Sequence, residues 1–494
     1  MPDRSETELP AAAWRPVGSA AAVLGIVLTG ASNGYGFHRD ELYFRALPAA
    51  WGYVDQPPLT PLLAHAFGHL SASPWALRIP ATLAAMASVL VLALITREMG
   101  GGGLAQGLCA WAYALASTPL VMGHVLLTAS LDLVIWPSAC LFLIRVLLRR
   151  RPRWWPAVGG TVGLATYNKL LIVLLVVALG AGLLIVGPRS VLRSRWFLAA
   201  VLIAAVLALP NLLYQATHSW PQISMGRALS DNNAGEIRIL MWPYLLLLLG
   251  PPLVPIWVAG LLALRSRPAW RPVKFLVVAF GVVLLETFAG GGQFYYPLGL
   301  LTVIFAIGCV PAADLLGRSP AWRRLTVVGV ALNAAVSAVI ALPVLPLSAL
   351  AASPVPAINQ TAGDQVGWPE YVRQIATVYQ HLPASDRQHA VIIASNYGEA
   401  GALDRYGPAL GLPHPYSGHN QLYFQARPPE VTRTVVIIGG QLPLAREHFA
   451  SCTVAARLHN DANVDNEEQG EPVAVCREPE QRWPSLWQVF QHYD

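Results

Sequence analysis

The sequence predicts an α-helical polytopic membrane domain followed by a soluble α/β domain. Of its 494 residues, 55% are hydrophobic and 12% charged, whereas an ordinary soluble domain is roughly 25% charged. The mean hydropathy is +0.48, and apolar runs long enough to cross a bilayer recur up to about residue 350. Beyond that point the composition is that of a soluble domain. We therefore predict a membrane domain at residues 1–350 and a soluble domain at residues 351–494.

The basic residues indicate membrane topology rather than nucleic-acid binding. The net charge is +6 and the isoelectric point is near 9.1, but most arginines stand in short clusters between apolar runs, where orientation signals lie. We exclude nucleic acid as a partner and expect membrane lipids instead. The positive-inside rule assigns to the cytoplasm the clusters at residues 145–153, 189–195, 265–274 and 318–324.

The apolar runs, taken in order, give about eleven crossings. The first run, at residues 20–32, lacks a convincing cleavage pattern and is predicted to be a retained span. Residues 156–186 begin and end at cytoplasmic clusters, so they should form two short helices, or a re-entrant hairpin, with TYNK (166–169) near the outer turn. The remaining spans are predicted at 77–97, 103–121, 126–147, 197–213, 238–262, 275–289, 297–316 and 325–347. With the N-terminus in the cytoplasm, the chain is outside the plasma membrane after the first crossing and again after the eleventh. The loop after the first span and the C-terminal domain are therefore predicted to lie outside.

The C-terminal domain alternates helical and strand patterns, which favours a layered sheet. Strand order does not follow from the sequence. Cys452 and Cys476 are the only cysteines of this domain; in an oxidising compartment they are disulfide candidates, although spacing does not establish the geometry. The predicted elements are a helix at 368–381, a strand at 390–395, a helix from 398, a strand at 434–438, a helix at 443–449, strands flanking Cys452 and Cys476, and a final helix at 484–492.

Two adjacent acids directly follow the first span. FHRDELYF (37–44) contains Asp40 and Glu41, and the proline-punctuated WGYVDQPPLTPLL (51–63) follows with Asp55 and Gln56. Acids beside a membrane are costly unless they serve a site or find a partner. In the alternative interpretation they are interfacial acids paired with neighbouring arginines, Arg39 or Arg45. On a helix, adjacent side chains point about 100° apart, so Asp40 and Glu41 should have different roles.

Two cations are candidates for holding a phosphate. Lys169 in TYNK is one of only two lysines, and the other, Lys274, belongs to a cytoplasmic cluster. Arg78 lies in WALRIPATL at the outer start of the second span. Fixed positive charge stabilises the negative charge of a leaving phosphate. The alternatives are a snorkelling lysine and an interfacial anchor.

Weaker signals point to the same outer face. His124 and Asp132 are eight residues apart, which predicts that they share one face of the fourth span. Asn168 precedes the lysine, and GGGQFYYP (290–297) carries Tyr295 and Tyr296. The alternatives are internal packing and an aromatic belt. In the soluble domain, NYGEAGALDRYG (396–407) and YSGHNQLY (416–423) could contact an acceptor or be purely structural.

Together these segments resemble the GT-C membrane glycosyltransferases. The acid loop, DQPPL, LRIP, NK and NYGEAGALD resemble the bacterial family-39 type, related to dolichyl-phosphate-mannose protein mannosyltransferases and the lipid A aminoarabinose transferase. The resemblance implies transfer, with inversion, of a monosaccharide from a polyprenyl-phosphate donor to a hydroxyl of a lipid, glycan or protein. It implies Asp40 as catalytic base and Glu41 as supporting acid or substrate ligand, and Arg78 matches a similar family pattern; we predict Lys169 and Arg78 as donor-phosphate ligands. As substrate-binding residues we predict Asp55, Gln56, His124, Asp132, Asn168, Tyr295 and Tyr296.

The sequence shows no His/Cys/carboxylate signature of a metal site, so a divalent metal is left open. It also lacks a nucleotide-binding glycine loop, which fits a lipid-linked sugar donor. One alternative is a polytopic transporter or flippase of lipid-linked sugars, whose sites lie near the midplane in broken helices. Another is a non-catalytic assembly or sensor protein. Only the enzyme requires Asp40 for sugar transfer.

Overall fold

The computed structural model describes residues 9–493, which divide into two compact units. The first comprises the chain up to Gly30, Arg78–Trp220 and Leu229–Ala341; the second comprises Ala31–Leu77, Pro221–Ala228 and the chain from Leu342 onward. The second unit resumes close to the predicted boundary at residue 350. It also takes in Ala31–Leu77, which the sequence assigned to the membrane domain.

The first unit is a bundle of apolar helices. In the described part of the chain, six helices are long and apolar enough to cross a membrane, or up to eight if each of two bent pairs is one span. The bent pairs are α5 with α6, at 54°, and the second part of α11 with α12, at 71°. Each of the eleven predicted segments coincides with a helix or helix pair, so the chain is a multi-pass membrane protein; the number of crossings stays a prediction. The helices are α1 (Trp14–Ala31), α4 (Pro74–Glu98), α5 (Gly103–Ala114), α6 (Ser117–His124), α7 (Asp132–Leu148), α8 (Trp155–Ala165), α9 (Ile172–Ile185), α10 (Arg195–Thr217), α11 (Pro221–Leu247), α12 (Val254–Ser266), α13 (Phe275–Gly290), α14 (Leu298–Arg318) and α15 (Pro320–Ala341).

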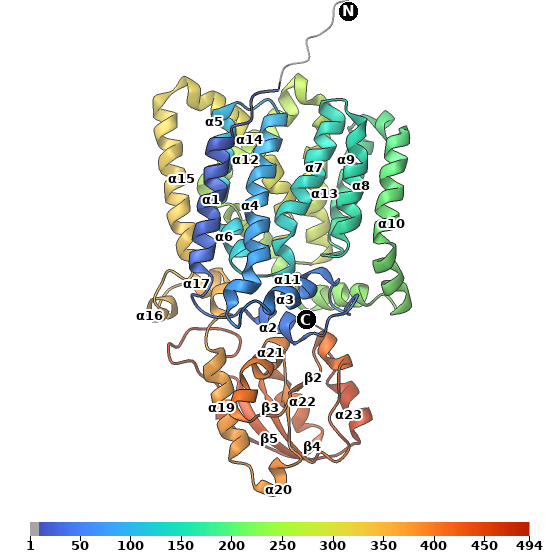
Figure 1. Ribbon diagram of the computed structural model, residues 1–494, viewed down its shortest axis with the longest axis vertical. Coiled ribbons are helices and arrows are strands. Elements are labelled where there is room, and N and C mark those ends of the chain that lie inside the picture. The colour runs from blue at the N-terminus through green and yellow to red at the C-terminus, as the bar shows by residue number, and fades with distance from the viewer. Residues whose placement is uncertain (1–8, 494) are drawn as a thin grey trace, which may run out of the picture. The chain divides into compact units, whose positions relative to one another are not determined.

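Helix α14 forms much of the core of this unit. It is buried along most of its length and contacts α5, α7, α12 and α15 (Figure 1). Two glycines allow α12 and α14 to approach closely. A Cβ atom on Gly308 would lie 1.9 Å from the Ile256 carbonyl oxygen, and one on Gly260 would lie 2.3 Å from the Ile304 carbonyl oxygen. Small residues at such contacts let membrane helices pack backbone to backbone.

One predicted basic cluster also connects two helices. Glu98, at the end of α4, is 3% exposed. Its two carboxylate oxygens accept hydrogen bonds from Arg145 Nε at 2.8 Å and Arg149 Nε at 3.1 Å. Because a buried carboxylate needs such partners, this cluster ties the end of α4 to that of α7 in addition to any role in orientation.

The prediction that His124 and Asp132 share a helix face is wrong. His124 is the last residue of α6 and Asp132 the first of α7. Between them the backbone is extended at Val125 and Leu127 and then forms a short 3-10 turn, Thr128–Ser130. The eight-residue spacing therefore does not correspond to two turns of one helix. Ser130 stabilises the break, because its Oγ donates to the Val125 carbonyl and accepts from the Leu127 amide, both at 3.0 Å.

The predicted pair of short helices at 156–186 is present as α8 and α9. The TYNK segment forms the turn between them, as predicted. Asn211 of α10 donates to the Thr166 carbonyl at 2.5 Å, and Asn168 donates to the Thr128 carbonyl at 3.0 Å. Hydrogen bonds with two other elements thus fix the turn that carries Lys169.

The second unit contains a five-stranded mixed sheet in the order β2-β1-β3-β5-β4. β1 pairs in parallel with β2 and β3, whereas β5 pairs antiparallel with β3 and β4. Helices α19 and α23 flank the sheet (Figure 1). The longer predicted elements are present, and β2 was not predicted. The bounds are α2 (Arg39–Ala46), α3 (Leu59–Gly68), α16 (Leu347–Ala351), α17 (Val355–Ile358), α18 (Gln360–Gly363), α19 (Trp368–Gln380), α20 (Ala384–Arg387), β1 (Val391–Ala394), α21 (Tyr397–Tyr406), β2 (Tyr416–Ser417), β3 (Thr434–Ile438), α22 (Leu442–Arg446), β4 (Phe449–Arg457), β5 (Pro472–Pro479) and α23 (Trp483–Val489).

A disulfide joins the two strands at one edge of the sheet. Cys452 of β4 and Cys476 of β5 face each other in the antiparallel register and are bonded. These are the two cysteines that the sequence analysis named as a candidate pair. The other three cysteines, Cys109, Cys140 and Cys309, are free and buried in the first unit.

Close packing of α21 on α2 explains why residues 31–77 fall into the second unit. A Cβ atom on Gly401 would lie 2.6 Å from the Leu42 carbonyl carbon, and one on Gly398 would lie 3.0 Å from Arg39 Cβ. Both glycines lie in NYGEAGALDRYG, one helical turn apart. Only residues without a side chain permit this approach, so the segment has a clear structural role.

Candidate active site

The N-terminus of α2 places the two predicted acids in different surroundings. His38 caps the helix: its Nδ1 accepts a hydrogen bond from the Asp40 amide at 3.2 Å. Glu41 completes the capping box, since its Oε2 accepts from the His38 amide at 2.9 Å. Glu41 is 0% exposed, whereas the Asp40 side chain is 26% exposed. The capping box thus gives Glu41 a structural role, and of the two acids Asp40 has the more accessible side chain.

Asp40 is held by a residue more than 350 positions away in the chain. The Tyr397 hydroxyl donates to Asp40 Oδ1 at 3.0 Å. Tyr397 is the first residue of α21, and its ring lies 4.8 Å from that of Tyr43 on α2. Burial, followed by the charge of Asp40, holds the pKa of Tyr397 well above its usual value. The phenol therefore stays protonated and remains a hydrogen-bond donor to the carboxylate.

Asp55 lies in the same neighbourhood. Its carboxylate hydrogen-bonds with Tyr43, and burial raises the pKa of Asp55 to about 7, with a smaller contribution from the charge of Asp40. Gln56 is 5% exposed, and its carbonyl accepts from the Tyr53 amide within the loop. We call Asp40, Tyr43, Asp55 and Tyr397 the acid group.

The arginines beside the acids have other partners. Arg39 forms an ion pair with Glu467, and its guanidinium lies 4.9 Å from the centre of the Tyr397 ring. Arg45 lies over the ring of Phe37 at 5.6 Å. Arg39 also interacts with the charge of Asp40, so the alternative interpretation of an interfacial acid beside an arginine stays open for this pair.

His38 provides a further contact next to Asp40. Its Nε2 lies 3.6 Å from Asp364 Oδ2. Burial works to lower the pKa of His38, but the hydrogen bond with Asp364 and the charges of Asp40, Asp364 and Glu41 outweigh it, so the pKa is raised. The cap of α2 uses an unprotonated Nδ1 of His38, whereas the neighbouring carboxylates favour protonation of the ring, which would remove that acceptor.

The predicted cation forms a second group in the first unit. Lys169 Nζ lies 3.4 Å from the Tyr295 hydroxyl and 5.4 Å and 5.2 Å from the ring centres of Tyr295 and Tyr296. Asn168 donates to Asp132 Oδ1 at 3.0 Å. We call these residues, Asp132, Asn168, Lys169, Tyr295 and Tyr296, the cationic group. All five were predicted site residues from three separate segments.

A small cavity adjoins the cationic group. Its volume is about 20 Å³, and Asp132, Tyr295 and Tyr296 are among its lining residues. Among the described residues, Asp132 Oδ2 has no hydrogen-bond partner. The cavity has room for about one water molecule. A phosphate or sugar would require lining side chains to move.

Arg78 and His124 form a buried pair of their own. Arg78 Nη1 donates to His124 Nε2 at 3.2 Å, and the two residues are 0% and 1% exposed. Arg78 extends from α4 to the end of α6. This contact connects two helices, as packing residues do, and it makes Arg78 a poorer candidate for a phosphate ligand than Lys169.

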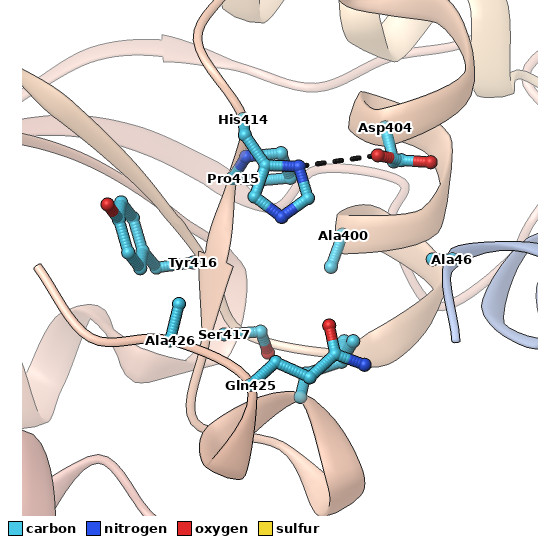
Figure 2. Close-up of a pocket in the computed structure, with 10 residues that line it drawn as sticks. Ala46, Ala400, Asp404, His414, Pro415, Tyr416, Ser417, Gln425 and Ala426 are labelled. Carbon is cyan, nitrogen blue, oxygen red and sulfur yellow. Dashed lines mark ion pairs between the residues drawn. The ribbon is translucent and has the colours of Figure 1, made fainter. Parts of the chain in front are cut away.

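Two further pockets lie in the second unit. A cavity of about 20 Å³ lies beside the ion pair of His414 and Asp404, whose Nδ1 and Oδ1 atoms are 3.3 Å apart (Figure 2). The hydrogen bond with Asp404 raises the pKa of His414. A groove of about 510 Å³ runs along α19, β4 and β5. The residues predicted singly to bind substrate line neither pocket, but the two candidate acceptor segments contribute Ala400, Asp404, Tyr416, Ser417 and Leu422 to the first. Within residues 9–493, no group of three or more His, Cys, Asp or Glu side chains could hold a metal ion.

The sequence analysis missed three residues of the site: Tyr397, Tyr43 and His38. Tyr43 and His38 lie in the same FHRDELYF segment as Asp40, and their pattern fits the start of a helix. Tyr397 lies in NYGEAGALDRYG, which was named only as a segment that could contact an acceptor or be purely structural. Gly398 and Gly401 are three residues apart, so they lie on one face of a helix. This spacing could have indicated close packing, but it does not identify the partner helix.

Comparison with known proteins supports the resemblance. Residues 55–214 match the family described as dolichyl-phosphate-mannose-protein mannosyltransferase. The structure is similar to ArnT from Cupriavidus metallidurans in the apo state, with a TM-score of 0.62, 16% identity, and coverage of 94% of this chain and 98% of that chain. For ArnT bound to undecaprenyl phosphate, the TM-score is 0.61, the identity 15%, and the coverage 93% and 97%.

A comparison with curated protein sequences gives no match. The structural likeness establishes the fold, and the family match covers Arg78, Asp132 and Lys169 but begins after Asp40. The fold is similar to that of ArnT, and residues 55–214 match the mannosyltransferase family, so the predicted resemblance is confirmed.

Proposed function

We propose that this protein transfers a monosaccharide from a polyprenyl-phosphate donor to a hydroxyl of a cell-envelope lipid, glycan or protein. The proposal rests mainly on the exposure and hydrogen bonding of the Asp40 side chain. It is a partly exposed carboxylate in the loop that resembles the catalytic loop of the family, and it is held by the Tyr397 hydroxyl at 3.0 Å.

The chemistry requires one base and one stabilised leaving group. The acceptor oxygen attacks the anomeric carbon, its proton passes to the Asp40 carboxylate, and the bond from the anomeric carbon to the phosphate oxygen breaks. A single displacement of this kind inverts the anomeric configuration. Asp40 suits the base role because it is accessible, whereas Glu41 is used in the capping box.

Lys169 is assigned to the donor phosphate. An ammonium flanked by two tyrosine rings and close to Asp132 is a fixed positive charge in an apolar environment. Such a charge stabilises the phosphate as it leaves with its electron pair. Asp132 and Asn168 position the lysine-bearing turn, and Tyr295 and Tyr296 line the adjoining cavity. Arg78, His124 and Gln56 are given supporting roles in packing.

Two observations support a lipid-linked donor and an outer-face reaction. ArnT, whose fold this chain shares, has been crystallised with undecaprenyl phosphate. The disulfide of Cys452 and Cys476 fits an oxidising compartment. We propose that the acid group and the C-terminal domain face the outside of the plasma membrane.

The decisive experiment for function is mass spectrometry of cell-envelope lipids and glycans in a deletion strain. We expect one monosaccharide to be missing from a specific acceptor and to return with the wild-type gene but not with the Asp40→Asn variant. An unchanged envelope would contradict the proposal, whereas loss of the sugar with accumulation of its donor on the cytoplasmic face alone would favour a flippase instead.

The orientation has a separate test. In intact spheroplasts, the chain beyond residue 352 should be cleaved by an added protease or modified by a membrane-impermeant label. Modification only after rupture of the inner membrane would show that the domain faces the cytoplasm and would contradict the proposed outer-face reaction.

A further inference from the structure

The C-terminal α/β domain contributes one residue directly to the acid group. Tyr397 begins α21 and is half-buried, and its hydroxyl reaches Asp40 Oδ1 at 3.0 Å. A tyrosine hydroxyl that only filled space would not need an ionisable partner on another element. Resting on the function proposed above, we propose that Tyr397 is a positioning residue that fixes the Asp40 carboxylate for proton transfer.

The backbone of Tyr397 is fixed from one side by the helix cap. Asn396 and Glu399 form a capping box, in which the Glu399 amide donates to Asn396 Oδ1 at 2.8 Å and the Asn396 amide to Glu399 Oε2 at 3.2 Å. Glu399 Oε2 also accepts from the Ser395 amide at 2.7 Å. These hydrogen bonds therefore fix the backbone conformation of the first turn of α21.

The end of the chain fixes Tyr397 from the other side. The Tyr397 amide donates to His419 Nδ1 at 3.2 Å, and the His419 ring stacks on that of His492 at 4.5 Å. The backbone of His492 bonds to both neighbours of His419: its amide donates to the Gly418 carbonyl at 3.1 Å, and its carbonyl accepts from the Asn420 amide at 3.0 Å. The C-terminal segment thus supports the residue that orients Tyr397.

The Tyr397 ring is also enclosed by its neighbours. Tyr43 lies at 4.8 Å, His419 at 4.9 Å, and the Arg39 guanidinium at 4.9 Å from the ring centre. These contacts fix the direction of the hydroxyl and involve only the ring. A phenylalanine at position 397 would keep them and lose only the bond to Asp40. The structure therefore permits a test that separates positioning from folding.

The hydrogen bond uses Asp40 Oδ1 as acceptor. A carboxylate fixed through one oxygen can present the other to the acceptor hydroxyl in a constant direction. Orientation of this kind lowers the barrier of the chemical step without changing donor affinity. The expected consequence of losing the bond is a lower kcat at unchanged KM for the donor.

The test compares Tyr397→Phe with Tyr406→Phe, the same substitution at the other end of α21. The substrate is decaprenyl-phosphate [14C]mannose, or the arabinose analogue if the deletion strain lacks a pentose, with purified full-length protein. We expect Tyr397→Phe to lower kcat about tenfold, with the KM for the donor and the melting temperature unchanged. Tyr406→Phe should behave as wild type.

The Asp40→Asn background shows whether Tyr397 acts through Asp40. There, Tyr397→Phe should cause no further loss, because the group it positions has already been disabled. Wild-type kcat in Tyr397→Phe, with Asp40→Asn impaired, would overturn the positioning role and leave the proposed function standing. An equal tenfold loss in both backgrounds would also overturn it. Wild-type turnover in Asp40→Asn would instead overturn the base assignment and the inference with it.

Discussion

The acid group and the cationic group are built in opposite ways. The cationic group is assembled from five residues that the sequence analysis had already named, and Lys169 is enclosed by Tyr295 and Tyr296. In the acid group, Asp40 is 26% exposed and accepts a hydrogen bond from Tyr397, which the sequence analysis named only within a longer segment and not as a site residue.

The difference follows from the surroundings of each charge. In an apolar bundle, an ammonium is so costly that its partners must be polar residues in neighbouring spans, and such residues are conspicuous in an apolar sequence. In the second unit, polar residues are common, so the one that binds Asp40 does not stand out. Charged residues in the sequence therefore predict site residues more reliably in the membrane domain than in the soluble domain.

The largest expected effect concerns Asp40. If it is the base, Asp40→Asn should lower transfer on the order of a hundredfold or more, because the amide keeps the shape but cannot accept the proton. Asp404→Asn, the same substitution in a partly exposed ion pair of the same unit (Figure 2), serves as control. Turnover is measured with the radiolabelled donor at matched expression.

Glu41→Gln sharpens the distinction between the two adjacent acids. Because a glutamine carbonyl oxygen can still accept the His38 amide in the capping box, Glu41→Gln should lower the free energy of unfolding by no more than about 1 kcal/mol. Its effect on kcat should be smaller than that of Asp40→Asn. A loss of turnover in Glu41→Gln alone, at unchanged melting temperature, would exchange the two roles.

The cationic group should respond through the donor. Lys169→Ala should raise the KM for the polyprenyl-phosphate donor about tenfold, because a partly buried charge contact is worth roughly 1.5–3 kcal/mol. Lys169→Arg should recover only part of the loss, since a planar guanidinium does not fit the position of a compact ammonium between the two rings. Lys274→Ala, at the only other lysine, is the control. An unchanged KM in Lys169→Ala would return this residue to a structural role.

The packing of α21 on α2 predicts a stability effect that links the acid group to the fold. Gly401→Ala would place a Cβ atom 2.6 Å from the Leu42 backbone. We expect a loss of about 1–3 kcal/mol in the free energy of unfolding from overpacking. Gly440→Ala, where the same atom meets nothing within 4 Å, should be close to neutral. Equal melting temperatures for the two variants would contradict the close approach.

The last expected effect is a pH dependence of stability from Asp55. Its pKa rises from 3.8 to about 7 in the folded protein, so between these values the folded form binds a proton that the unfolded form has lost. Stability from this group is therefore fully present below about pH 4 and is lost as the pH rises through 7. Asp55→Asn should raise the melting temperature relative to wild type at pH 8 and change it little at pH 4. An identical difference at both pH values would show that Asp55 does not titrate in this window.

Most helices, and the order of elements in the soluble domain, could be predicted because apolar runs and period-two strands are local patterns. TYNK at the turn between α8 and α9 followed from charge parity and length alone. The prediction that His124 and Asp132 share a helix face failed because the helix breaks at residues 125–130. The sequence across this break is as apolar as that of a continuous span, so composition does not reveal it.

The sequence by itself determined that this chain is a membrane protein with a soluble domain, and it named the acids, the lysine and the two bonded cysteines. These conclusions depend on hydropathy, charge and spacing, which are properties of short segments. Only the tertiary structure decided that Glu41 caps a helix while Asp40 stays accessible, that Arg78 is paired with His124, and that Tyr397 binds Asp40. Hydrogen bonds between distant segments depend on how two backbones approach, and in the second unit that approach is set by the absent side chains of Gly398 and Gly401.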